Sequence, residues 1–345
     1  MSLSPPAPRS LRLLRAGAQL LDAPLPATPE EVVRRLLAVQ AQDLRAARLA
    51  LRARSSAPLT AAGVDGALAG DRSLVVGWLC RGTLHLVCAE DYPWLLALTA
   101  PTRFATSRRR LGQEGVAPDD ADRAVTVIER ALADEGPLTR AALAERIAAR
   151  GIRTEGQATP HLLMLAALRG VAVLAGEQRF VLARDWLGAP LPAPVDRERA
   201  LAELARRYLT AHGPATAADL AAWSGLPVRD ARAGLTAIAG ELLEVDGELV
   251  DLTAREPAPD SIPPRLLAAF DPYLLGWKDR SFAVPAEHAR RVHPGGGVLR
   301  AVATIDGLVV GTWRARRRVE LEPFGPIEET AFRAEIEDVA RFSGG

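Results

Sequence analysis

The residues Gln40 and Gln42 are the most unusual candidates for chemistry in this sequence, because glutamine is neither a strong base nor a nucleophile. They lie one residue apart in the stretch LAVQAQDLRAA, between two segments with helical periodicity. In one continuous helix their side chains would lie about 200° apart, almost on opposite faces. They can converge only if residues 40–42 form a turn between two helices, with Asp43 capping the second helix.

Two interpretations of the glutamines remain open at this point. In the first, Gln40 holds the turn by bonding backbone groups, because a buried amide without partners costs about 1–3 kcal/mol. In the second, the two amides form part of an active site that works without a carboxylate. The spacing alone favours the first interpretation.

Composition limits the class of protein. A chain of 345 residues predicts two or three domains, and contents of 48% apolar and 25% charged residues are typical of globular proteins. No run approaches the ~18 apolar residues of a membrane span, and the N-terminus lacks the features of a secretory signal. We therefore expect a cytoplasmic protein with no membrane partner.

Neither a metal nor a cofactor is expected. Cys80 and Cys88 are the only cysteines, and their spacing predicts neither a disulfide framework nor a zinc site. The glycine-rich stretch PGGGV is followed by no phosphate-loop Gly-Lys-Ser/Thr. Four histidines lack neighbouring ligand residues, namely His161, His212, His288 and His293.

The type of basic residue says more about nucleic-acid binding than the number of basic residues does. The formal net charge is only +1, and Lys278 is the only lysine among 43 basic residues. A GC-rich genome also favours arginine over lysine. The planar guanidinium nevertheless suits phosphates and guanine edges, so clusters of arginine are the feature to examine.

A weak internal repeat indicates the organisation of the chain. The stretches PATPEEVV, PLTRAALA and PATAADLA each place a threonine two residues after a proline, at Thr28, Thr139 and Thr216. Each threonine is well placed as a helix N-cap. Each copy is followed by a second helical pattern and then by a β-hairpin pattern, such as LLEVDGELVDL with its Asp246-Gly247 turn signal.

The order helix, helix, hairpin predicts three tandem winged-helix units in an α+β protein. The last quarter alternates like antiparallel strands, with a turn at Asp306-Gly307 and a closing helix from about Ile327 to Phe342. We expect a small β-barrel-like domain there. The expected domains are residues 1–115, which include the glutamines, residues 116–190, residues 191–256, and the β-rich residues 257–345.

Five blocks of sequence resemble one known family, in the order in which that family has them. They are VVRRLLAVQAQDLRAARLALRAR, WLCRGTLHLV, GPATAADLAAWSGL, LLAAFDPYLLGWKDRS and DGLVVGTWR. The chain resembles, over nearly its whole length, the tandem winged-helix family that contains the AlkZ-type DNA glycosylases. The resemblance implies three winged helices and a β-barrel, C-shaped around DNA. Within the family, the AlkZ-like branch has a glutamine–apolar–glutamine catalytic motif and the YcaQ-like branch has aspartate at the second glutamine. Gln40-Ala41-Gln42 resembles the AlkZ-like form, so the resemblance implies that both glutamines are catalytic.

Hydrolysis of an N-glycosidic bond is plausible without a carboxylate. A purine alkylated at N7 already carries a positive charge and leaves as a neutral base. The enzyme then needs a positioned water and negative dipoles near the developing oxocarbenium ion, and two glutamine carbonyls supply both. The expected partner is double-stranded DNA with an alkylated purine, including bulky or crosslinked adducts.

The candidate DNA-binding residues are mostly arginines. Alternation along the stretch WRARRRVE predicts Arg314, Arg316 and Arg318 on one face of a strand. His85, in a predicted hairpin, is a candidate contact to the lesion or backbone, with a structural role as the alternative. Asp43 is expected to cap a helix. The full set is Asp43, Arg45, Arg48, Arg81, His85, Arg108, Arg109, Arg314, Arg316 and Arg318.

A non-catalytic DNA-binding protein, such as a transcriptional regulator, is the alternative to the enzyme. It would use the same winged helices, and the glutamine motif favours the enzyme. No dimerisation coiled coil is predicted, which argues against a regulator of palindromic sites. We expect a monomer associated with the nucleoid.

Overall fold

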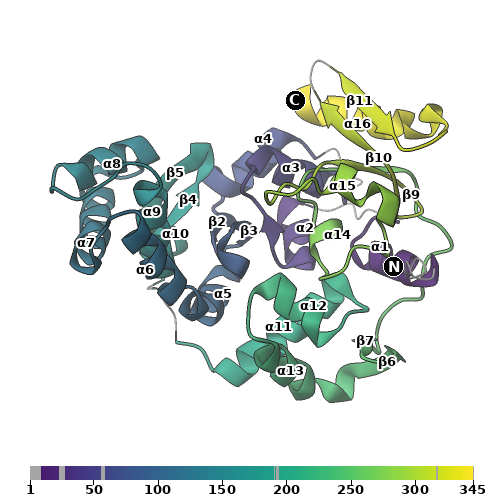
Figure 1. Cartoon of the computed structure of the whole chain (residues 1–345), viewed down its shortest axis with the longest axis horizontal. Coiled ribbons are helices and arrows are strands. Elements are labelled where there is room, and N and C mark those ends of the chain that lie inside the picture. Colours follow the sequence, from purple (N-terminus) through teal and green to yellow (C-terminus); the bar gives the residue numbers. More distant parts are fainter. Residues whose placement is uncertain are drawn as a thin grey trace. The chain divides into compact units, whose positions relative to one another are not determined.

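The structure is a computed structural model that describes residues 9–22, 28–55, 59–189, 191, 194–315 and 318–344. It is a mixed helix and sheet fold, as expected, and Figure 1 shows its elements in sequence colours. The chain divides into two compact units. The first contains residues 1–64, 201–223 and 227–345, and the second contains residues 65–200 and 224–226. No described helix is long and apolar enough to cross a membrane.

The first unit contains most of the N-terminal and C-terminal elements. Its helices are α1 (Arg9–Ala18), α2 (Pro29–Leu36), α3 (Leu44–Arg52), α4 (Ala61–Asp65), α11 (Arg197–His212), α12 (Ala217–Ser224), α13 (Val228–Ala237), α14 (Pro272–Leu275), α15 (Ala289–Val292) and α16 (Arg333–Gly344). Its strands are β1 (Val39–Gln40), β6 (Leu242–Asp246), β7 (Leu249–Leu252), β8 (Arg265–Leu267), β9 (Val302–Ile305), β10 (Leu308–Ala315) and β11 (Val319–Pro323).

The second unit is a helical layer with an antiparallel sheet. Its helices are α5 (Tyr92–Thr99), α6 (Phe104–Gln113), α7 (Pro118–Glu135), α8 (Arg140–Ala148), α9 (Ala158–Leu168) and α10 (Ala183–Leu187). Its strands are β2 (Leu74–Trp78), β3 (Leu84–Cys88), β4 (Ala172–Ala175) and β5 (Arg179–Leu182), in the sheet order β3-β2-β4-β5. Cys80 and Cys88 are free thiols in its core.

All three repeated threonines cap helices, as predicted. Thr28 forms a capping box with Glu31 at the start of α2. The Thr139 hydroxyl accepts a hydrogen bond from the backbone N–H of Ala142 at the start of α8. The Thr216 hydroxyl accepts one from the backbone N–H of Asp219 before α12, and the Asp219 carboxylate accepts one in return from the Thr216 N–H. The repeat in sequence therefore corresponds to a repeat in local structure.

The predicted hairpins are present, with one shift. β9 and β10 are joined by Asp306-Gly307, both at positive φ, as an Asp-Gly turn requires. In the β6–β7 hairpin the two loop residues are Gly247 and Glu248 instead of Asp246-Gly247, because Asp246 pairs with Leu249. An irregularity in register between Glu244 and Asp246 moves the turn by one residue.

The C-terminal strands do not form a closed barrel among the described residues. They form an open antiparallel sheet in the order β11-β10-β9-β8. Helix α16 packs on this sheet through a core that includes Trp313, Phe332 and Val339 (Figure 1). The regular part of the closing helix begins at Arg333, a few residues later than predicted, after a turn of 3₁₀ helix over Glu329–Phe332.

The strand that was expected to carry three arginines ends too early, so that prediction is wrong. β10 ends at Ala315, which pairs with Val319 at the start of β11. Arg318 therefore lies in the connection between the strands and not on β10. Arg316 and Arg317 lie outside the described residues.

Candidate functional site

The segment between α2 and α3 is extended, so Gln40 and Gln42 do not lie on one continuous helix. α2 ends at Leu36, and the buried Leu37 has φ 66°, a conformation that stops the helix. The chain then runs through β1 to Asp43. Val39 and Ala41 are 0% and 4% exposed, whereas Gln40 is partly exposed and Gln42 is exposed. Gln42 lies in the bend that follows β1, and the two amides are the side chains of residues 39–42 that reach solvent.

Asp43 caps α3, as predicted from sequence. Its Oδ1 accepts hydrogen bonds from the backbone N–H groups of Arg45 at 2.9 Å and Ala46 at 3.4 Å. This cap fixes where α3 begins and therefore where the extended segment ends. The carboxylate is exposed, so it remains accessible one residue from Gln42.

Two buried arginines at the end of α3 hold that helix in the first unit. Arg52 contacts α16 through Glu335 at 3.0 Å and Asp338 at 2.8 Å. The Arg54 guanidinium donates to both Asp271 oxygens, at 2.7 and 3.1 Å, and both side chains are completely buried. Asp271 also accepts from the backbone N–H of Tyr273, which caps α14. The segment that carries the glutamines is thus anchored by charge pairs in the core.

Four of the predicted residues line one cavity. Asp43, Arg45 and Arg48 on the α3 side and Arg314 on β10 surround a volume of about 550 Å³. Arg45 is exposed, whereas Arg314 pairs with Glu320 at 2.8 Å and Glu322 at 3.1 Å. We call this cavity the α3 pocket. Sequence reasoning missed that Trp313 and Phe342 also line it, although Trp313 is adjacent to Arg314 in the sequence.

The remaining predicted residues belong to the second unit. His85 on β3 is 1% exposed, and its Nδ1 lies 2.9 Å from the Thr83 carbonyl oxygen. Burial and the nearby Arg81 charge lower the pKa of His85 to about 3, so the imidazole is neutral. A neutral ring enclosed in this way favours the structural alternative. Arg81 is half-buried in a left-handed turn at φ 57°.

Helix α6 carries the other two predicted arginines. Arg108 is exposed and lies 3.7 Å from the Asp122 carboxylate, and Arg109 is exposed. Whether either contacts DNA stays a prediction. One group in this unit has the donor atoms for a metal ion, Cys88, Glu90 and Asp91, within 4.8 Å of one another. One Asp91 oxygen accepts a hydrogen bond from the Trp94 indole at 3.0 Å. The absence of a metal therefore stays a prediction.

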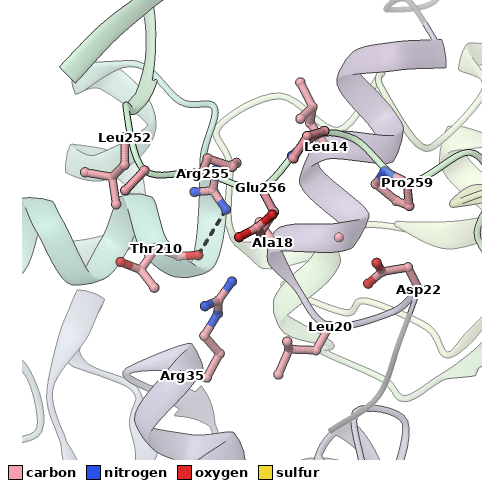
Figure 2. Close-up of a pocket in the computed structure, with 13 residues that line it drawn as sticks. Leu14, Ala18, Leu20, Asp22, Arg35, Thr210, Leu252, Arg255, Glu256 and Pro259 are labelled. Atoms are coloured by element: carbon pink, nitrogen blue, oxygen red, sulfur yellow. Dashed lines mark hydrogen bonds between the residues drawn. The ribbon is translucent and has the colours of Figure 1, made fainter. Parts of the chain in front are cut away.

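A second cavity in the first unit contains none of the predicted residues. It has a volume of about 480 Å³, and Figure 2 shows Arg35, Arg255 and Glu256 around it. The Arg255 guanidinium already has partners within the protein. It pairs with Asp251 at 2.6 Å and donates a hydrogen bond to the Thr210 carbonyl oxygen near the end of α11 (Figure 2). Burial and the Arg255 charge lower the pKa of Arg35. Neither this cavity nor the α3 pocket is lined by Gln40 or Gln42, so the candidate site rests on the glutamine motif itself and not on a cavity.

Comparison with known proteins agrees with the sequence blocks. Residues 33–342 match the family of AlkZ-like DNA glycosylases. A curated relative, the "Interstrand DNA cross-link repair glycosylase" of Streptomyces sahachiroi, is 31% identical over 96% of this chain and 95% of its own. A solved structure, the DNA glycosylase AlkZ of Streptomyces sahachiroi, aligns with a TM-score of 0.79 and 28% identity, over 97% of this chain and 96% of that one.

Proposed function

Because this chain belongs to the AlkZ-like DNA glycosylase family, we propose that it hydrolyses the N-glycosidic bond of N7-alkylated purines in DNA. The relative named for interstrand cross-link repair supports extending the substrates to bulky or crosslinked adducts. We also propose that the three helix–helix–hairpin repeats are winged-helix units, which together with the β-rich C-terminal part surround the DNA. We also propose that the enzyme acts as a monomer at the nucleoid, and that its domain boundaries are those predicted from sequence.

The exposure of both amides, partial for Gln40 and full for Gln42, is the observation that supports the mechanism. The carbonyl oxygens of Gln40 and Gln42 accept hydrogen bonds from one water and hold it toward C1′ of the damaged nucleotide. The water oxygen forms a bond to C1′ as the C1′–N9 bond breaks. The bonding electron pair goes to the purine, which leaves neutral, and the water loses a proton to solvent. The carbonyl dipoles also stabilise the positive charge that develops on the sugar.

The amides also account for selectivity. A normal purine needs protonation before it can leave, and neither amide is a proton donor of useful acidity. A base that already carries a charge leaves without that help. The Asp43 oxygen used as a helix cap fits a positioning role better than a role as general base.

The direct test is incubation with DNA that contains N7-methylguanine, followed by detection of the free base by mass spectrometry. The proposal expects free N7-methylguanine and an abasic site. Tight binding of the same DNA without any released base above the spontaneous rate would instead support the non-catalytic DNA-binding alternative.

Phosphate contacts are expected from the exposed arginine of the α3 pocket. Arg45→Gln should weaken binding to all DNA sequences alike and reduce the slope of log affinity against log salt by about 1. Arg314→Gln is the matched control, since Glu320 and Glu322 already neutralise that guanidinium. Fluorescence anisotropy at several salt concentrations measures both. An unchanged slope in Arg45→Gln would remove this residue from the DNA contacts.

The reaction should stop at an intact abasic site. Strand cleavage by a glycosylase uses a Schiff base with an amine, and arginine cannot supply one because its guanidinium stays protonated. Lys278 is the only side-chain amine in the chain and is exposed, with its backbone N–H held by Asp219 at 2.9 Å. It does not line the α3 pocket. The N-terminal amine lies outside the described residues.

Borohydride trapping during turnover checks this expectation. We expect no covalent protein–DNA adduct, and strand breaks only after alkali or an abasic endonuclease is added. A trapped adduct that disappears in Lys278→Ala would show a lyase step and would place Lys278 at the site.

A further inference from the structure

The α3 pocket has a composition that base excision alone does not explain. We infer that it receives a flat apolar substituent attached to the damaged purine, so that it selects bulky adducts over small ones. This inference rests on the proposed function, because it assumes that the purine is presented to the glutamine segment. It assigns a ligand class to a cavity rather than a new reaction.

The walls of the α3 pocket are apolar. Leu49, Trp313 and Phe342 provide large side chains, and six of the lining residues are alanines. The short alanine side chains are what leave the space open. Trp313 is only 6% exposed, and its indole N–H donates to the Leu267 carbonyl oxygen at 2.8 Å. Its polar atom is therefore satisfied, and the ring offers the pocket an apolar surface held in a fixed position.

The rim of the pocket is basic. Arg314 is neutralised by Glu320 and Glu322, but Arg45 and Arg48 still outnumber the one carboxylate in the lining, that of Asp43. An apolar ligand with no charge would gain nothing from these arginines. A substituent on a DNA base is flanked by phosphates on both sides, so an apolar wall with a basic rim matches it.

The size and position of the pocket fit the same ligand. Its volume of about 550 Å³ lies within the range of small-molecule sites, and a methyl group would leave it almost empty. Asp43 at its edge directly follows Gln42, and adjacent Cα atoms are about 3.8 Å apart. This adjacency is the reason why we assign the pocket to a ring linked to N7 of a purine held by the glutamines.

The test compares two DNAs of one sequence, carrying N7-methylguanine or N7-benzylguanine. Ala269 lines the pocket and is partly exposed, so Ala269→Leu fills space at little cost to folding. We expect the ratio of benzyl to methyl base release to fall by about tenfold or more. Ala301→Leu, also in the lining, should act in the same direction. Ala340→Leu is the control, since this exposed α16 residue does not line the pocket.

The outcomes separate this inference from the proposed function. An unchanged release ratio in both filled variants, with melting temperatures equal to wild type, would overturn the assignment of the pocket. If wild type releases neither base, the proposed function fails. In that case DNA affinity tests the pocket. Wild type should bind the benzylated DNA more tightly than the methylated DNA, and Ala269→Leu and Ala301→Leu should lose this difference in affinity.

Discussion

Gln42→Ala is expected to reduce the release of alkylated base by about 100-fold or more, which is the usual cost of removing one preorganised dipole from a reaction centre. The physical reason is that the water loses one of the two acceptors that orient it toward C1′. Because Gln42 is exposed, its removal leaves no buried group without a partner. DNA affinity and melting temperature should therefore stay close to those of wild type. Single-turnover measurement of free base checks the rate.

Two further variants make the result interpretable. Gln40→Ala should also lose activity, but this amide is partly buried, so its melting temperature must be measured as well. Gln157→Ala removes an exposed glutamine in the second unit and should release base at the wild-type rate. If the activity of a variant falls only as much as its fraction of folded protein falls, the glutamines hold the turn and do not take part in the reaction. Full activity in both Gln40→Ala and Gln42→Ala would exclude the amides from the mechanism.

Asp271→Ala is expected to lower the free energy of unfolding by about 3–5 kcal/mol, because it leaves the buried Arg54 charge uncompensated. Both side chains of this pair are completely buried. Arg54→Ala should have a similar effect. Denaturation with urea, followed by circular dichroism, measures the change.

An exposed ion pair provides the control for this prediction. Arg146 and Glu135 lie 2.7 Å apart, and each side chain is more than a third exposed. Arg146→Ala should leave the free energy of unfolding close to that of wild type, since water screens the pair. If Asp271→Ala has the same free energy of unfolding as Arg146→Ala, the buried pair does not anchor α3 as described.

Local features of the fold could be predicted from sequence because short-range chemistry determines them. The caps at Thr28 and Thr139 need only a hydroxyl and the adjacent N–H groups. The Asp306-Gly307 turn needs only two residues that tolerate positive φ. The break between the two helices around Gln40 was also predictable, because the internal repeat places a turn there.

Features that depend on distant contacts could not be predicted. The ion pair of Arg314 with Glu320 depends on cross-strand register, which places the two residues opposite each other and is not visible in composition. The burial of His85 depends on how β3 packs in its sheet. The α3 pocket combines residues as far apart as Asp43 and Ser343, so no local pattern indicates it. The catalytic role of the glutamines came from resemblance and not from their geometry.

The alternation of buried and exposed side chains over residues 39–42 also limits how this motif can evolve. Insertion or deletion of a single residue between Gln40 and Gln42 would turn one amide into the core and one apolar side chain out to solvent. Such a change damages folding and chemistry at once. Lineages that alter substrate preference here are therefore restricted to substitutions at fixed length, with the position of Ala41 confined to side chains that fit a buried site.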